Sequence, residues 1–141
     1  MQKILVAADG SKHAQKAIAY LVKHREQFGS QPEIQLMHVR TPLPGRAASA
    51  LGRKTVDKYY GEETRKELAS AMRALDKAKL EYNVVPRVGD AAQEIANYAT
   101  QGRFTLLVMG SHGHGRLAEM VLGSTVSKVL ALCRTPVLIV R

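Results

Sequence analysis

A glycine-rich stretch near the end of the chain carries residue types that suit the binding of an anion. Residues 109–125 read MGSHGHGRLAEMVLGST, between an apolar run and a helix-like pattern. Glycine lets a backbone approach a ligand closely, and backbone N–H groups at the start of a helix attract phosphate. Ser124 and Thr125 add hydroxyl and amide donors, and Arg116 adds long-range attraction. The glycines are Gly110, Gly113, Gly115 and Gly123. We therefore expect this segment to bind a phosphate group.

Three well-known phosphate motifs do not match the segment. The Walker A motif needs a Gly-Lys pair, and the chain contains none. The dinucleotide motif matches only loosely, because the segment follows the fourth expected strand and no acidic residue follows at about twenty residues. A kinase glycine loop would need a partner lysine strand and an Asp/Asn metal pair. The spacing that remains is Gly110-x2-Gly113-x9-Gly123-Ser124.

Other reactive side chains have simpler interpretations. His112 and His114 form a His-x-His pair, but no third ligand stands at a metal-binding spacing, so we expect solvated or phosphate-contacting side chains rather than a metal site. Asp9, Ser11 and His13 are the residue types of a catalytic triad, yet they are close neighbours in sequence, so we expect no triad. Asp9 follows an apolar run, where it could cap a helix or contact a ligand.

The elements that position these residues alternate along the chain. Apolar runs at 4–8, 33–40, 83–88, 104–109 and 137–140 predict strands, and most are continuous enough to be buried on both faces. Helical spacing predicts helices after Ser11, from about 59 to 81, after Asp90 and from Ser124, with Ser11 and Asp90 as caps. Residues 41–58 are rich in Pro, Gly and Ala and are basic, which predicts a long mobile loop.

This order predicts an α/β fold in a single domain over residues 1–141. Strands that alternate with helices form a parallel sheet covered on both faces, a three-layer sandwich. Ligands of such folds bind beyond the carboxyl ends of the strands, where the strand order reverses. The glycine segment and the turn at Asp9 both follow strands, so we expect them to meet at that edge.

Composition limits the class of protein. The chain is 45% hydrophobic and 23% charged, which is typical of a globular domain. One cysteine, Cys133, rules out an intrachain disulfide. The apolar run at the start is too short for a signal peptide or a membrane span, so we expect a cytoplasmic protein without membrane contact. The net charge of +9 raises nucleic-acid binding as an alternative, but Trp is absent and aromatic residues are 5% of the chain, which makes that partner unlikely.

Taken together, the motifs resemble the universal stress protein family from end to end. KILVAADGS at 3–11, HVR at 38–40, and GSHGHG, LGSTVSKVL and TPVLIVR in the last third match the family's pattern, and the glycine spacing matches its ATP-binding branch. The resemblance implies a five-stranded sheet ordered 3-2-1-4-5 and a homodimer. It places Asp9 near the ribose and phosphates or Mg²⁺. It implies that Ala7 and Val39 line the adenine pocket and that Met109 lies above Gly110.

The same resemblance assigns the phosphates to Gly113, Gly123, Ser124 and Thr125. Ala7 is a departure, because some ATP-binding members have proline there, and we expect only a slightly altered pocket. The expected function is an ATP-binding stress-response protein, with ATP, ADP or AMP and Mg²⁺ as ligands, that acts as a signalling or survival module with at most slow ATP hydrolysis. The apolar edge strand at 137–140 is expected to pair with its copy in a homodimer. The alternative is a basic interaction module for nucleic acid or an acidic protein.

Overall fold

The chain alternates strands and helices, as the sequence predicts. The computed structural model describes residues 2–114 and 121–141. Its strands are β1 (Lys3–Ala7), β2 (Glu33–Arg40), β3 (Tyr82–Val88), β4 (Leu106–Gly110) and β5 (Val137–Val140). Its helices are α1 (Lys12–Lys23), a short 3-10 helix (Arg25–Phe28), α2 (Gly45–Leu51), α3 (Arg53–Lys77), α4 (Ala91–Gln101) and α5 (Ser124–Leu132).

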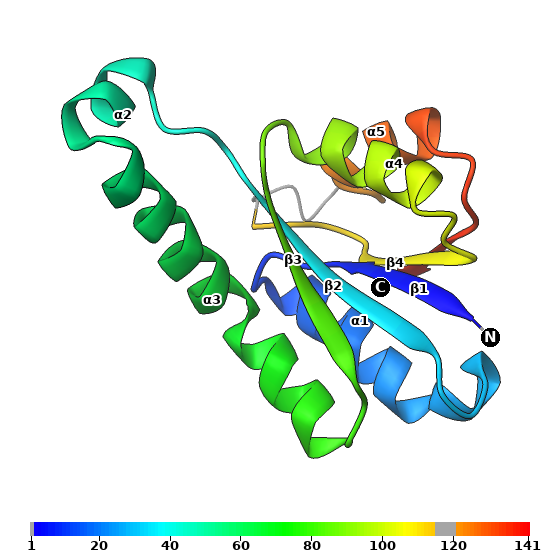
Figure 1. The fold of residues 1–141 in the computed structure, drawn as a ribbon. Helices are drawn as coiled ribbons and strands as arrows, with labels where there is room; N and C mark the ends of the chain where they lie inside the picture. Colours follow the sequence, from blue (N-terminus) through cyan, green and yellow to red (C-terminus); the bar gives the residue numbers. More distant parts are fainter. Residues whose placement is uncertain (1, 115–120) are drawn as a thin grey trace.

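All five strands join in one parallel sheet with the order β3-β2-β1-β4-β5, which confirms the predicted topology. The register places Val6 of β1 between Leu36 of β2 and Val108 of β4. Helices α1 and α3 pack together on one face of the sheet, and α4 and α5 pack together on the other (Figure 1). The fold is therefore the expected three-layer α/β sandwich.

The central strand explains why its sequence is an unbroken apolar run. Ile4 and Val6 point into the core beneath α1 and α3, while Leu5 and Ala7 point toward α4 and α5. Ile4, Leu5 and Val6 are fully buried. A strand covered on both faces has no solvent-facing position, so alternation with polar residues disappears.

Two predicted helix caps are present. The Ser11 hydroxyl oxygen accepts a hydrogen bond from the backbone N–H of Ala14 at 3.2 Å, at the start of α1. The Asp90 carboxylate accepts one from the backbone N–H of Gln93 at 3.0 Å, at the start of α4. Each cap fixes where a strand-to-helix turn ends, and the Ser11 cap follows directly on the turn that carries Asp9.

The predicted loop at 41–58 is wrong for most of its length. Residues 45–51 form α2, and α3 begins at Arg53, six residues before the expected start, so only residues 41–44 and Gly52 lie outside helices. The alanine-rich sequence favours a helix, and Gly52, at φ +80°, separates the two helices. Val56 is buried, and the Tyr60 hydroxyl accepts a hydrogen bond from the Leu43 backbone N–H at 2.8 Å. Proline and glycine mark helix ends here rather than a loop.

Several other boundaries differ from expectation by a few residues. Helix α3 ends at Lys77 rather than near 81, and α1 ends at Lys23 before the short 3-10 helix. Pro86 lies in β3, an edge strand, where its missing N–H breaks no central ladder. Among the described residues, no helix is long and apolar enough to cross a membrane.

Candidate functional site

A cavity of about 350 Å³ opens at the carboxyl ends of β1, β2 and β4. The sheet order reverses between β1 and β4, because β2 and β3 lie on one side of β1 and β4 and β5 lie on the other. Doubly wound sheets bind their ligands at this switch point. The volume is at the lower end of the range for small-molecule sites.

Every predicted site residue that the structure describes lines this one cavity. They are Ala7, Asp9, Val39, Met109, Gly110, His112, Gly113, Gly123, Ser124 and Thr125. The predicted residues Gly115 and Arg116 lie outside the described residues. Residues that are far apart in sequence meet here because parallel strands end at the same edge of the sheet.

Part of the cavity wall is apolar. Val39 and Met109 lie there with Ile95 of α4 and Val126 of α5. These residues belong to the core between the sheet and helices α4 and α5 or pack against it. Ile95 and Val126 were not predicted as site residues, since their helical spacing predicted only core positions. An apolar wall of this kind suits a flat, uncharged ring.

Another part of the wall is formed by Gly110, Gly113, Gly123 and the start of α5. A Cβ atom on Gly113 would lie 2.7 Å from Asp9 Oδ2, and one on Gly123 would lie 3.1 Å from His112 Cα. Gly123 is the N-cap of α5 and provides no side-chain hydrogen bond to it. The N–H groups of the first turn, which includes Ser124, therefore have no side-chain cap, and such groups attract anions.

Gly110 allows the end of β4 to approach α1. A Cβ atom at this position would lie 2.5 Å from both the carbonyl carbon and the carbonyl oxygen of His13. The contact is with backbone, so no side-chain rotation relieves it. The absence of a side chain at Gly110 thus sets how closely the end of β4, which lines the cavity, packs against α1.

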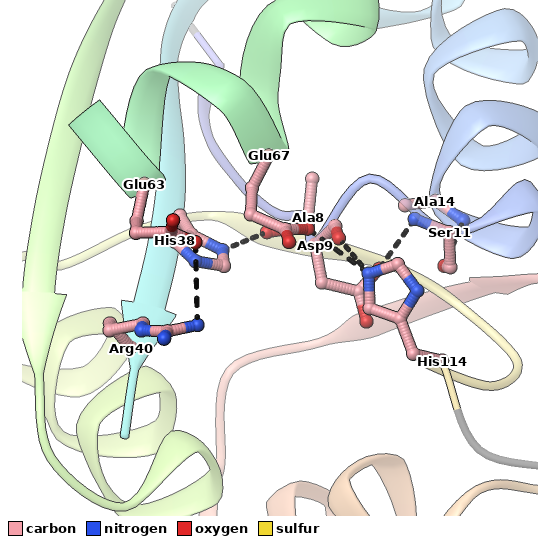
Figure 2. Close-up of polar contacts among 9 residues, drawn as sticks. All are labelled: Ala8, Asp9, Ser11, Ala14, His38, Arg40, Glu63, Glu67 and His114. Atoms are coloured by element: carbon pink, nitrogen blue, oxygen red, sulfur yellow. Dashed lines mark hydrogen bonds and ion pairs between the residues drawn. The ribbon is translucent and has the colours of Figure 1, made fainter. Parts of the chain in front are cut away.

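Sequence reasoning missed the acidic side of the cavity. Glu67 of α3 lines it, and its Oε2 lies 3.0 Å from Nε2 of His114, which also hydrogen-bonds to the carbonyl oxygen of Asp9. Figure 2 shows one nitrogen of the His114 ring facing both the Glu67 carboxylate and Asp9. The contact joins α3, the turn after β1 and the glycine segment. The helical spacing of α3 gave no signal for this role, because it reports only which face is buried.

These hydrogen bonds raise the pKa of His114 above its ordinary value, chiefly through the Glu67 carboxylate and then through the Asp9 carbonyl. We expect Glu67→Gln to lower the pKa of His114, because a neutral amide stabilises the imidazolium less. Because the pKa of His114 is higher in the folded than in the unfolded protein, its protonated ring stabilises the fold. This stabilisation is complete below the ordinary pKa of about 6.5 and is lost as pH rises through the pKa of the folded protein. An NMR titration of the histidine ring signals checks this. Glu62→Gln is the control, and an equal His114 pKa in wild type and Glu67→Gln would contradict it.

A second polar group lies beside the cavity on β2. His38 is buried, and its Nδ1 donates a hydrogen bond to the Ala8 carbonyl at 3.0 Å. Arg40 Nη1 lies 3.6 Å from the Glu63 carboxylate (Figure 2). Its Nη2 donates a hydrogen bond to the Tyr59 hydroxyl at 2.6 Å. His38 and Arg40 line the cavity but were not predicted as site residues. Both belong to the HVR segment, which indicated the strand and not its polar contacts.

One histidine of the glycine segment, His112, contacts a buried serine. His112 Nδ1 lies 2.9 Å from the Ser111 hydroxyl, and the His112 and His13 rings lie 4.9 Å apart. Over residues 2–114 and 121–141, no group of three or more His, Cys, Asp or Glu side chains is placed to hold a metal ion.

The sheet order defines a doubly wound α/β protein, and a cavity lies at its switch point. The chain belongs to the universal stress protein family, whose sequence profile matches residues 1–141. It is 33% identical over 147 residues to the universal stress protein YxiE of Bacillus subtilis, covering 99% of this chain and 98% of that protein.

Solved structures agree with this assignment. The structure of MJ0577, a universal stress protein of Methanocaldococcus jannaschii, has a TM-score of 0.77 and 26% identity, and the match covers 99% of this chain and 94% of that chain. A universal stress protein in complex with cAMP has the same fold, with a TM-score of 0.71 and 22% identity, covering 99% of this chain and 97% of that chain.

Proposed function

We propose that this protein binds an adenine nucleotide, namely ATP, ADP or AMP, in the cavity at the carboxyl edge of the sheet. The observation that carries the proposal is one cavity whose lining combines an apolar wall with close-packed glycines beside a helix start without a side-chain cap. The adenine ring lies against Val39 and Met109. The phosphates lie against Gly113 and Gly123 and accept hydrogen bonds at the start of α5.

The comparisons support an adenine nucleotide as the ligand. Structures of the same fold contain cAMP, AMP in a protein of Arabidopsis thaliana, and dAMP in a protein of Archaeoglobus fulgidus. These ligands share the adenine ring and one phosphate. The apolar wall and the phosphate-binding end of this cavity suit those two groups.

We further propose that Mg²⁺ accompanies a longer phosphate chain. The Asp9 carboxylate lies beside Gly113, with one oxygen accepting a hydrogen bond from the Ser11 N–H at 3.0 Å and the other facing the glycine segment. Mg²⁺ usually binds one or two protein carboxylates together with substrate phosphates, which suits this position. When bound, it neutralises phosphate charge. The role of Asp9 is to orient the ion.

We propose that the protein acts by being occupied or not occupied by the nucleotide. It would do so as a cytoplasmic stress-response module that signals or promotes survival. Fast phosphoryl transfer needs a positioned nucleophile and several cationic groups around the transferred phosphate. Of the described residues that line the cavity, Arg40 is the one Arg or Lys, and it lies against Glu63. The proposal therefore includes at most slow ATP hydrolysis.

Thermal unfolding with and without Mg-ATP tests the proposed function. Binding to the native state alone at about 100 times Kd stabilises it by about 2.7 kcal/mol, which raises Tm by several degrees for a chain of this size. GTP is the control for recognition of the adenine base, and inorganic triphosphate is the control for charge alone. We expect a shift with ATP and a much smaller one with both controls. Equal shifts with all three ligands, or none in protein freed of co-purified nucleotide, would contradict the proposal.

We also propose a homodimer that forms through β5. This strand is the sheet edge opposite β3, and its four apolar residues are only partly buried. The neighbouring helix α5 exposes Leu130 and Leu132 at 41% and 51%. An apolar edge strand is stabilised by pairing with another strand. Light scattering at micromolar concentration should give twice the chain mass, and a strict monomer would contradict this interface.

A second candidate function rests on the basic arm. Arg46, Arg53, Lys54 and Lys58 are exposed on α2 and the first turns of α3, which extend away from the sheet (Figure 1). This arm could attract nucleic acid or an acidic protein. A steep loss of nucleic-acid binding with rising salt would favour this function, whereas binding that is absent at low salt would exclude nucleic acid as the partner.

A further inference from the structure

A carboxylate from α3 lines the cavity beside the turn that carries Asp9. Glu67 lines the cavity together with Gly113 and Ser124, and its side chain is 23% exposed. Packing fixes the helix at this point, because Thr64 and Leu68 on either side are buried. Glu67 is therefore part of a rigid wall of the cavity.

The turn after β1 is shaped around Glu67. Gly10 has φ +77°, and a Cβ atom there would lie 2.8 Å from Glu67 Oε2 and 2.9 Å from its carbonyl oxygen. The absence of a side chain at Gly10 lets α3 approach the turn that carries Asp9. Two carboxylates, Asp9 and Glu67, consequently border the same end of the cavity.

Among the residues that the structure describes, the charges around the cavity do not cancel. The ionisable residues that line the cavity within the described chain are Asp9, His38, Arg40, Glu67, His112 and His114. Arg40 is paired with Glu63 at 3.6 Å. His114 contacts Glu67, but its own side chain is 60% exposed, so water screens the charge that it carries when protonated. The described part of this end is therefore unfavourable for a ligand with several negative charges.

We propose that Glu67 is a specificity-determining residue that limits the charge of the phosphate chain, so that AMP binds in preference to metal-free ATP. This inference rests on the proposed binding of an adenine nucleotide. A single phosphate is satisfied by the glycine segment and the start of α5. Each further phosphate brings another negative charge into a cavity bordered by Glu67 and Asp9. We expect the repulsion between these carboxylates and the added phosphate charge to weaken binding by about tenfold after solvent screening.

Isothermal titration calorimetry tests the inference with AMP, ADP and ATP in EDTA, at about pH 8, where the phosphates are ionised. The proteins are wild type, Glu67→Gln and the control Glu62→Gln. Glu62 lies on the same helix, and its side chain is 63% exposed and 4.0 Å from Lys58, so the control makes the same change in net charge away from the cavity. Thermal unfolding of each variant checks that it is folded.

We expect wild type to bind ATP about tenfold more weakly than AMP. Glu67→Gln should strengthen ATP binding by about tenfold and AMP binding by less than about threefold, while Glu62→Gln changes neither. An equal effect of Glu67→Gln on AMP and ATP, or no effect on either, would overturn the role of Glu67 but leave nucleotide binding intact. Failure of wild type and Glu67→Gln to bind any of the three nucleotides would overturn the proposed function and this inference with it.

A measurement on wild type alone gives a second test. Salt screens the repulsion between carboxylates and phosphates. Raising NaCl from about 50 to about 300 mM should therefore bring the ratio of the ATP dissociation constant to the AMP dissociation constant closer to one. A ratio that widens with salt would mean that attraction to the phosphate chain dominates, and this would overturn the inference.

Discussion

Gly113→Val is expected to weaken Mg-ATP binding by about a hundredfold or more while the protein remains folded. A Cβ atom at Gly113 would lie 2.7 Å from Asp9 Oδ2, in the space between the glycine segment and the proposed magnesium ligand. The atom it meets is the end of a side chain, which can rotate. Gly113 does not have the left-handed backbone conformation that disfavours other residues. Among the described residues, the added Cβ atom meets only the Asp9 side chain, so the substitution is expected to fill the cavity and displace Asp9.

Calorimetry with Mg-ATP and thermal unfolding, both on the same preparation, measure the two parts of this expectation. Gly61→Val is the matched control, since Gly61 lies in α3 and a Cβ atom there would have no neighbour within 4 Å outside the backbone of its own helix. The control should bind like wild type. Affinity that is unchanged in Gly113→Val would contradict the proposed phosphate site. Loss of the folded state in Gly113→Val would contradict the expectation that only the Asp9 side chain has to move.

Gly110→Ala is expected to lower the free energy of unfolding by about 3 kcal/mol, the upper part of the usual range for overpacking. The added Cβ atom would lie 2.5 Å from the His13 carbonyl carbon and oxygen. These are backbone atoms of α1, so relief requires the helix to move away from the end of β4. Such a movement also disturbs the packing of Ala14 and Ala17, which are buried on the same helix. Urea denaturation should show a lower midpoint with an unchanged slope.

Gly61→Ala provides the comparison for this second substitution. It makes the same chemical change inside a helix, but no atom of another element lies close to the new methyl group. Alanine favours a helix over glycine by about 0.5–1 kcal/mol, so the control should be slightly more stable than wild type. Similar stability changes in the two variants would mean that the contact between β4 and α1 does not depend on a glycine.

Gly110 and Gly113 are expected to have different roles although they belong to one motif. Gly110 and Gly113 belong to the same spacing in the sequence, and a motif match treats them alike. The atoms that surround them differ, since a side chain at Gly110 meets the backbone of α1 and one at Gly113 meets the Asp9 side chain. The first position is thus expected to control stability and the second to control binding.

Much of the fold was determined by local sequence. Continuous apolar runs such as β1 arise because a strand covered on both faces needs no polar positions, and Ser11 and Asp90 cap helices through hydrogen bonds to residues three positions away. The glycine spacing and the family resemblance indicated the edge of the sheet where the cavity lies, because parallel strands all end there. These features depend on neighbours in the chain or on a repeated pattern.

The tertiary structure alone decided which additional side chains face that cavity. Glu67 reaches it because α3 packs onto Gly10, although the two are far apart in sequence, and His114 then meets Glu67 across the opening. The helical start of α3 was also missed, although Val56 in its first turns is buried. Local patterns determine where strands and helices form and how they are capped. The charge that surrounds a ligand is decided by side chains from separate elements, and only the packed structure brings these together.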